Sequence, residues 1–307
     1  MSFHSGRTTV VVALAAILGL AGCGSSGSAG SGGGAVPVSS AASALPSLTK
    51  DAALAAMVPA AITTKGTLTV GTDASYAPNE FIDADGKTVI GFDADLAKAI
   101  GSVLGLKVVL QNAPFGTLVE GVKTGKFDLG MSSFTINADR EAQVDMVSYF
   151  SAGTSWAVET GNPTGLTPET ACGKKIAVQK DTVQVPDVTA RSKACTDAGK
   201  PAITVEQFPL QSDATSAVVT GKDDGLLADS PVVAYAVKLT AGKLQSVGST
   251  YDSAPYGIVV PKGSGDYAKA VQGAVQKLMG GGSYLEILKR WNVDSGALTT
   301  AAINPKG

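Results

Sequence analysis

Histidine and cysteine are scarce in this 307-residue chain, which contains one histidine, His4, and three cysteines. Histidine-based acid–base catalysis and histidine metal ligation are therefore excluded from everything downstream of the N-terminal segment. Charge is nearly balanced, with 24 lysines and arginines against 26 aspartates and glutamates, and no basic block occurs. This balance argues against nucleic acid as a partner. The apolar run at 10–20 is too short to span a bilayer as a helix.

The N-terminal segment has the pattern of an export signal. Arg7 precedes the apolar run at 10–20, which has the proportions of a signal-peptide core. LAGC at 20–23 follows and resembles the lipobox of bacterial lipoproteins, in which the cysteine becomes the acylated first residue. We predict a lipoprotein signal peptide at 1–22, lipidation (palmitate) at Cys23, and an anchor on the extracytoplasmic face of the cell membrane. An ordinary signal peptide with an incidental cysteine is the alternative.

Glycine and serine dominate the stretch after Cys23. GSSGSAGSGGG at 24–34 is typical of a flexible linker, and we predict a tether over 23–60. The remaining cysteines, Cys172 and Cys195, would lie in an oxidising compartment, which favours one disulfide over a metal site or a nucleophile. Such a disulfide would contribute about 2–4 kcal/mol. Two buried, reduced thiols are the alternative.

Strands and helices alternate through the rest of the chain, which indicates two α/β units in succession. Strands are predicted at 66–72, 107–112, 127–132, 175–179, 203–208, 225–228 and 254–261. Helices are predicted at 48–57, 93–105, 117–125, 167–173, 185–199, 211–221, 231–239, 267–279 and 284–291. A further helix is predicted to begin at 137. Asp93 is expected to cap the helix at 93–105, and Thr167 the short helix at 167–173.

Unusual polar residues gather where strands end or helices begin, which is where open α/β sheets bind ligands. They are Asp73, Tyr76, Ser132 to Thr135, Arg140, Asp181, Thr182 and Asp229. Arg140 is the most informative of them, because it lies near the start of the helix predicted from 137, where the helix dipole disfavours a cation. We therefore expect a carboxylate partner for Arg140, either from the protein or from a ligand.

Several motifs together resemble one family. They are GTDASYAPNEFIDADGKTVIGFDADLAKAIG, GKFDLGMSSFTINADREAQVDMVSYF, KIAVQKDT, GLLADSP and APYGIVVPKGS, in an order that runs from about Gly66 to the C-terminus. The chain resembles the polar amino acid solute-binding proteins of ABC importers, which include histidine-, lysine/arginine/ornithine- and glutamine-binding proteins.

That resemblance implies a periplasmic-binding-protein-like α/β fold of type II. Each of its two lobes has a mixed sheet flanked by helices, and two crossing hinge segments join the lobes. The expected boundaries are 61–153 with 252–307 for lobe 1, and 154–251 for lobe 2. The resemblance also implies a monomeric binding protein that is not an enzyme and needs neither cofactor nor metal.

The resemblance assigns the grip on the ligand backbone residue by residue. Arg140 would form a bidentate pair with the ligand α-carboxylate, and Asp229 would bind the α-ammonium group. Further hydrogen bonds to the ligand would come from Ser132, Ser133, Thr135 and Thr182. Three alternatives remain open: Asp229 caps the helix at 231–239, Arg140 pairs with Asp139 or Glu141 on the surface, and Thr182 is a helix cap.

Side-chain recognition rests on two aromatic and two acidic positions. Tyr76 and Phe115 match the walls that enclose the ligand side chain, while Asp73 and Asp93 match acids that meet its distal end. We therefore expect a basic ligand (arginine, lysine, ornithine or histidine), with glutamine next. Asp93 as a plain helix cap is the alternative. One departure weakens transfer of specificity, because YAPNE places Asn79 where the family has phenylalanine.

The sequence thus predicts a lipid-anchored receptor that passes its ligand to an ABC permease and its ATPase. Two other classes remain open. One is a sensor module that presents the ligand to a membrane receptor. The other is a dehydratase-like enzyme on the same fold, with Glu80 or Asp73 as the acid.

Overall fold

A computed structural model describes residues 48–305. The predicted signal peptide, the lipidation of Cys23 and the 23–47 part of the predicted tether lie outside these residues. Within 48–305, no helix has the length and apolar character needed for a membrane span.

The folded body begins earlier than the predicted start at 61. Helices α1 (Ala52–Ala56) and α2 (Ala60–Lys65) precede the first strand. Leu48 and Val58 pack against the main hydrophobic core. Asp51 caps α1 and also forms an ion pair at 2.7 Å with Lys277 of α9 (Tyr267–Gly280). The part of the predicted tether from Leu48 onward is therefore packed structure, because its apolar residues have a core to cover.

Two units of identical topology form most of the molecule. The first contains β1 (Thr67–Thr72), α3 (Phe92–Leu104), β5 (Lys107–Asn112), α4 (Leu118–Lys123) and β6 (Leu129–Thr135). The second contains β8 (Lys175–Gln179), α6 (Gln184–Asp197), β9 (Thr204–Phe208), α7 (Gln211–Val219) and β10 (Gly225–Asp229). Strands pair in parallel as β5–β1–β6 and as β9–β8–β10. These pairings confirm the two predicted α/β units, which we call lobe 1 and lobe 2.

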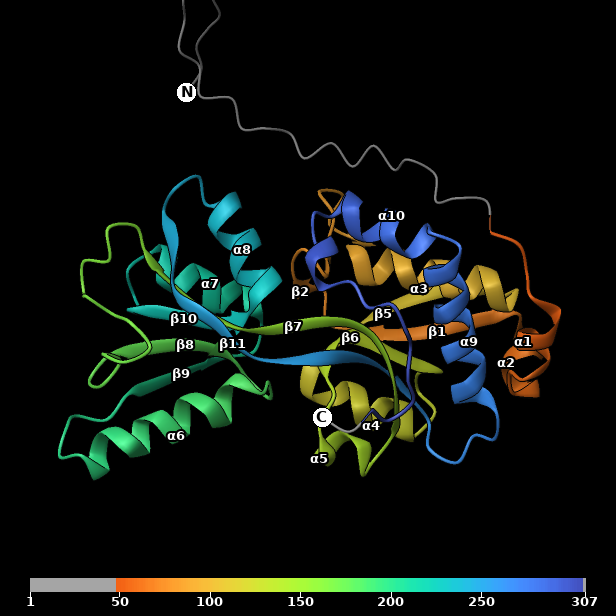
Figure 1. The fold of residues 1–307 in the computed structure, drawn as a ribbon, viewed down its shortest axis with the longest axis horizontal. Coiled ribbons are helices and arrows are strands. Elements are labelled where there is room, and N and C mark those ends of the chain that lie inside the picture. The colour runs from red at the N-terminus through yellow and green to blue at the C-terminus, as the bar shows by residue number, and fades with distance from the viewer. Residues whose placement is uncertain (1–47, 306–307) are drawn as a thin grey trace, which may run out of the picture. The chain divides into compact units, whose positions relative to one another are not determined.

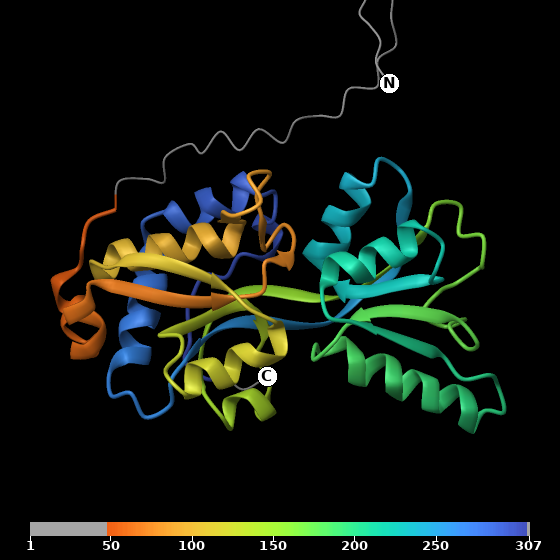
Figure 2. The ribbon, with the colours of Figure 1, turned by 180° about the vertical axis from the view of Figure 1, so that it is seen from behind.

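Two long strands pass from one lobe to the other, as both views show (Figures 1 and 2). They are β7 (Asp145–Glu159) and β11 (Leu244–Val260), which pair antiparallel along most of their length. Strand β11 also pairs with β6, and β7 with β10, so one eight-stranded sheet runs β5-β1-β6-β11-β7-β10-β8-β9. These strands are the two crossing segments expected for the fold. Their paired region includes positions 153–154 and 251–252, where we expected the lobe boundaries.

Helices cover both faces of each half of the sheet. In lobe 1, α3 packs with α9 and α10 (Ser283–Arg290), and α4 packs on β1 and β6. In lobe 2, α6 lies on one face and α7 with α8 (Ser230–Leu239) on the other (Figure 1). All five residues of β10 are buried, as expected for a central strand whose two faces are covered by helices.

Smaller elements complete the described residues. A three-stranded sheet beside lobe 1 contains β2 (Ser75–Tyr76), β3 (Glu80–Ile82) and β4 (Val89–Ile90). The remaining short helices are η1 (Phe115–Thr117), α5 (Ala138–Glu141) and η2 (Asp294–Gly296).

Two local predictions were wrong. Asp93 does not cap α3, because the helix begins at Phe92 and Gly91 is the N-cap with φ of 127°. A Cβ at Gly91 would lie 2.1 Å from the carbonyl oxygen of Asn79, so only glycine fits there. The segment 167–173 forms turns rather than a helix.

The disulfide prediction is confirmed. Cys172, in the turn before β8, is bonded to Cys195 of α6, with the two Cα atoms 5.6 Å apart. The bond links α6 to the segment that leads into β8.

Candidate functional site

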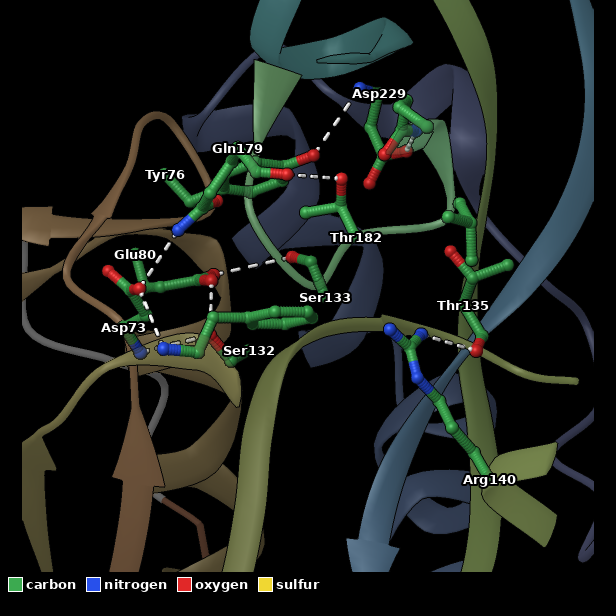
Figure 3. A pocket seen from close by; sticks show the side chains of 13 residues that line it. Asp73, Tyr76, Glu80, Ser132, Ser133, Thr135, Arg140, Gln179, Thr182 and Asp229 are labelled. Atoms are coloured by element: carbon green, nitrogen blue, oxygen red, sulfur yellow. Dashed lines mark hydrogen bonds between the residues drawn. The ribbon is translucent and has the colours of Figure 1, made fainter. Parts of the chain in front are cut away.

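A cavity of about 290 Å³, measured with its open mouth, lies between the lobes. Its lining brings together every predicted ligand-binding residue except Asp93 (Figure 3). The lining residues are Asp73, Tyr76, Glu80, Phe115, Ser132, Ser133, Thr135, Arg140, Gln179, Thr182, Val183, Gln184 and Asp229.

Strand ends supply most of the polar groups, as the sequence predicted. Asp73 directly follows β1, Gln179 ends β8, and Asp229 ends β10. Ser132 and Ser133 lie within β6, which extends to Thr135 rather than ending at 132. The carboxyl ends of parallel strands in both lobes therefore face one cavity.

Arg140 has no carboxylate partner among residues 48–305. Its Nη1 donates to the carbonyl oxygen of Thr135 at 2.8 Å, and its guanidinium lies 5.4 Å from the ring centre of Phe115 and 5.5 Å from that of Phe134. No ion pair with Asp139 or Glu141 occurs in this part of the chain, so the surface-pair alternative is wrong. Burial lowers the pKa of Arg140 to about 10, which leaves it a cation at neutral pH.

Contrary to the prediction, no helix dipole disfavours Arg140. Helix α5 is only four residues long, and Arg140 is its third residue. So short a helix has a negligible macrodipole. What makes Arg140 unusual is that its partly buried guanidinium keeps four of its five donor hydrogens available for another acceptor.

Asp229 lies at the N-cap position of α8 but makes no side-chain capping bond. Its carboxylate instead accepts hydrogen bonds from Gln184 Nε2 and from the hydroxyl of Tyr256, each at 2.7 Å. Its backbone N–H donates to the hydroxyl of Tyr76 at 3.3 Å. Burial raises the pKa of Asp229. The simple capping alternative is therefore wrong for this residue.

Thr182 is not the cap of α6, because the N-cap residue is Val183. Its hydroxyl donates to the carbonyl oxygen of Gln179 at 2.8 Å, which closes the turn between β8 and α6. Thr182, Val183 and Gln184 all line the cavity, so the amino end of the 14-residue helix α6 is beside it. A helix N-terminus favours a bound anion.

Asp73 is held by three donors. Ser75 Oγ donates to its Oδ1 at 2.7 Å, while the N–H of Phe115 and Nε2 of Gln179 donate to its Oδ2 at 3.0 and 2.9 Å. Burial raises the pKa of Asp73, and the three donors oppose that shift by favouring the ionised form. Phe115 stacks on Phe134 with ring centres 4.9 Å apart and forms an apolar wall beside this carboxylate.

Asp93 does not line the cavity, which corrects its predicted place. It is 1% exposed, and its Oδ2 accepts bonds from the backbone N–H of Ser133 at 3.0 Å and from the Tyr149 hydroxyl at 2.7 Å. It thus lies behind Ser133, as seen from the cavity.

Sequence reasoning missed four lining residues: Glu80 as part of a binding site, and Gln179, Val183 and Gln184 altogether. The strand-end rule would have found Gln179, since it is the last residue of β8. Glu80 had no such signal, because the three-residue strand β3 cannot be recognised from the sequence pattern.

The two lobes are in direct contact across the cavity. Hydrogen bonds that join them include Gln179 to Asp73, the Asp229 N–H to Tyr76, the Gln211 N–H to Ser75 Oγ at 3.1 Å, and the Tyr256 hydroxyl to Asp229. The structure therefore shows a closed arrangement.

Comparison with protein-family models identifies the chain. Residues 68–294 match the family described as bacterial extracellular solute-binding proteins, family 3. This chain belongs to that family. As the family description implies, the solute-binding protein works outside the cytoplasm.

Similar proteins are named as binding proteins rather than enzymes. The arginine-binding protein ArgT of Corynebacterium glutamicum is 38% identical over 250 residues, which cover 81% of this chain and 82% of ArgT. An ancestral arginine-binding protein solved with bound arginine is 34% identical, with a TM-score of 0.68 over 74% of this chain and 98% of that one. A structure of an ancestral arginine-binding protein with bound glutamine is 33% identical, with a TM-score of 0.67 over 74% of this chain and 98% of that one. The type II two-lobed fold expected from the sequence is thereby confirmed.

Proposed function

We propose that this solute-binding protein captures a basic amino acid, foremost arginine, and delivers it to an ABC importer. The observation that carries the proposal is the distribution of charge in one cavity. Arg140 and Asp229, which suit a carboxylate and an ammonium group, line the same cavity as Asp73 and Glu80, which lie on the opposite side from Arg140 (Figure 3). A zwitterion with a cationic side chain complements this arrangement.

The aromatic residues support the same ligand class. Tyr76 and Phe115 line the cavity beside Asp73, and an aliphatic stem or a flat guanidinium gains from contact with ring faces. Arginine-binding proteins among the similar sequences and structures, including ArgT, are consistent with this choice.

The lobes provide the means of selection. We place their boundaries at 153/154 and 251/252, with Arg140 and Asp73 on lobe 1 and Thr182 and Asp229 on lobe 2. A ligand that touches both lobes stabilises the closed form, and the closed form then docks on the permease and its ATPase. Lipidation of Cys23 would hold the receptor, as a monomer, at the outer face of the membrane.

The ligand class is tested by the thermal melting of the purified protein with arginine, lysine, ornithine, histidine and glutamine in turn. A ligand of the folded state at a hundredfold excess over its Kd stabilises by about 2.7 kcal/mol and raises the melting temperature. We expect the largest rise with arginine. No rise with any basic amino acid would refute the proposed ligand class.

The site is tested with Arg140→Lys, which keeps the charge but loses the two-pronged donor. Losing one hydrogen bond to a charged group costs about 1.5–3 kcal/mol, so arginine affinity should fall at least about tenfold. Arg290→Lys is the matched control, because Arg290 pairs with Asp95 outside the cavity at 3.3 Å. Equal affinity in the two variants would show that Arg140 does not hold the ligand.

A further inference from the structure

Two acidic side chains lie against each other beside the cavity. Glu80 of β3 lines the cavity, and Asp93 of α3 lies directly behind it; each is 1% exposed. Glu80 Oε2 and Asp93 Oδ2 each lie 3.3 Å from the Ser133 hydroxyl oxygen, which places the two carboxyl groups side by side. Two ionised carboxylates at this separation, both removed from water, repel strongly.

The surrounding donors do not satisfy both carboxylates. Ser132 Oγ donates to Glu80 Oε1 at 2.8 Å. Ser133 Oγ lies 3.3 Å from both Glu80 Oε2 and Asp93 Oδ2, and it accepts a bond from Asn79 Nδ2 at 2.8 Å. A hydroxyl has one hydrogen, so Ser133 serves only one carboxylate at a time.

One oxygen of the pair is left without a donor. Asp93 Oδ1 is buried and receives no hydrogen bond from any donor within residues 48–305. A proton carried by Glu80 and shared with Asp93 would satisfy such an oxygen and remove the repulsion between the two groups.

The groups that face the pair supply no compensating cation. Asp73, next to β2, adds a third carboxylate, and the nearby titratable groups are the hydroxyls of Tyr76 on β2 and Tyr149 on β7. Neither carboxyl forms an ion pair with a lysine or arginine in the described part of the chain. Burial, followed by the charge of Asp93, raises the pKa of Glu80 well above its usual value, and burial raises that of Asp93 to about 6.

We propose that the Glu80–Asp93 pair holds one proton in the ligand-free protein and releases it when a cationic ligand side chain enters beside Glu80. The inference rests on the proposed function, since it concerns the side-chain end of the same cavity. The O–H bond of Glu80 breaks, its electron pair stays on the carboxylate, and the proton passes to buffer. The pair then carries two negative charges, and the ligand cation offsets the added charge. A neutral amide side chain, such as that of glutamine, is bound with the proton in place.

This coupling makes pH a determinant of specificity. By linkage, release of one proton strengthens arginine binding by up to about tenfold for each unit of rising pH in the range where the pair titrates. Binding of glutamine stays nearly independent of pH in the same range. Acidification therefore shifts the receptor away from cationic ligands and toward neutral ones.

Isothermal titration calorimetry of the purified protein near neutral pH tests the proposal. Arginine and glutamine are each titrated in phosphate and in Tris, two buffers with very different ionisation enthalpies. The difference between the observed enthalpies reports the number of protons released. We expect a clear release of up to one proton with arginine and none with glutamine.

Glu80→Gln should abolish the proton release, whereas Glu120→Gln should retain it, because Glu120 is an exposed residue of α4 that pairs with Lys123 at 2.7 Å. Unchanged release in Glu80→Gln would overturn the assignment to the pair. Arginine binding with equal heats in both buffers would overturn the proposal while leaving the proposed function intact. Absence of binding by any basic amino acid would overturn both. If Glu80→Gln fails to fold, the comparison of arginine with glutamine in the two buffers, made with the wild-type protein, still tests the proposal.

Discussion

Asn79 occupies a fully buried position where the family resemblance expects phenylalanine. Its amide nitrogen holds the Ser133 hydroxyl, and that hydroxyl in turn faces both acids of the Glu80–Asp93 pair. A phenylalanine could not donate this hydrogen bond. The single substitution thus ties a polar network to the wall of the cavity, which is a property of this chain rather than of the family motif.

Asp93 should make the free energy of unfolding fall as pH rises, whereas an acid with a lowered pKa makes it rise. Its folded-state pKa is raised from 3.8 to about 6, so the folded state binds the proton more tightly than the unfolded state does. The resulting stabilisation is fully present below the unfolded pKa and is lost as pH rises toward 6. Asp93→Asn should remove this loss, because an amide does not ionise and can donate to Glu80.

Urea unfolding across the window from pH 3.8 to 6 measures this effect. The stability of Asp93→Asn relative to wild type should rise through the window and then level off. A relative stability that falls with pH would contradict the assignment, because it would mean that ionised Asp93 stabilises the fold.

At the scale of elements, a cross-link and a polar cluster hold α6 against lobe 2. The cross-link is the Cys172–Cys195 disulfide, and the cluster joins Asp187 of α6 to Tyr251 of β11 and Trp156 of β7. Helix α6 depends on them because it has few buried residues: Gln184, Val188 and Cys195. A helix with so little buried surface needs other contacts to stay docked.

Replacing both cysteines by serine should lower the free energy of unfolding by about 3 kcal/mol, because the bond spans a sequence separation of 23 residues. Urea unfolding of the oxidised protein and of the double variant measures the difference. Reduction of the wild-type protein should reproduce it. A loss below about 1 kcal/mol would show that α6 is held by its other contacts.

Tyr251→Phe should cost about 1–3 kcal/mol, because it leaves the buried indole N–H of Trp156 without an acceptor. The Tyr251 hydroxyl also donates to Asp187, so the variant loses both bonds. Tyr235→Phe is the control. The ring centres of Tyr235 and Phe81 are 6.1 Å apart, and the Tyr235 hydroxyl makes no hydrogen bond to residues 48–305. Equal urea midpoints for the two variants would argue against the cluster as a stabilising unit.

At the scale of the whole molecule, both lobes depend on the crossing of β7 and β11. The register of the two strands shifts between Val247 and Tyr251 and again between Tyr251 and Ala254, so the ladder is irregular at the crossing. Gly153 lies there, and a Cβ at this position would be 2.6 Å from the carbonyl oxygen of Tyr251. The close approach of the two backbones therefore requires glycine.

Gly153→Ala should force the crossing strands apart, lower stability by about 1–3 kcal/mol and weaken ligand binding, because closure requires both lobes. Gly280→Ala is a suitable control, since nothing lies within 4 Å of a Cβ at that position. Urea unfolding and arginine titration compare the two variants. Wild-type stability and affinity in Gly153→Ala would show that the crossing tolerates separation.

Periodicity revealed the elements that belong wholly to one lobe. The strand at 225–228 and the helix at 267–279 correspond to β10 and α9 within one or two residues, because each buries a continuous apolar stretch or stripe. Strand β7 was missed, and only the second half of β11 was found. These two strands lie in two lobes at once, so their burial changes along their length and no single pattern marks them.

By itself the sequence determined the fold class, the disulfide and most of the side chains that line the cavity, because strand ends and family motifs carry that information locally. Only the tertiary structure decided how those groups pair. It placed Asp93 behind Ser133, brought Gln179 of lobe 2 to Asp73 of lobe 1, and set Glu80 and Asp93 around the same Ser133 hydroxyl. The physical reason is that burial and the separation between charged groups depend on contacts between distant segments, and no local pattern encodes those contacts.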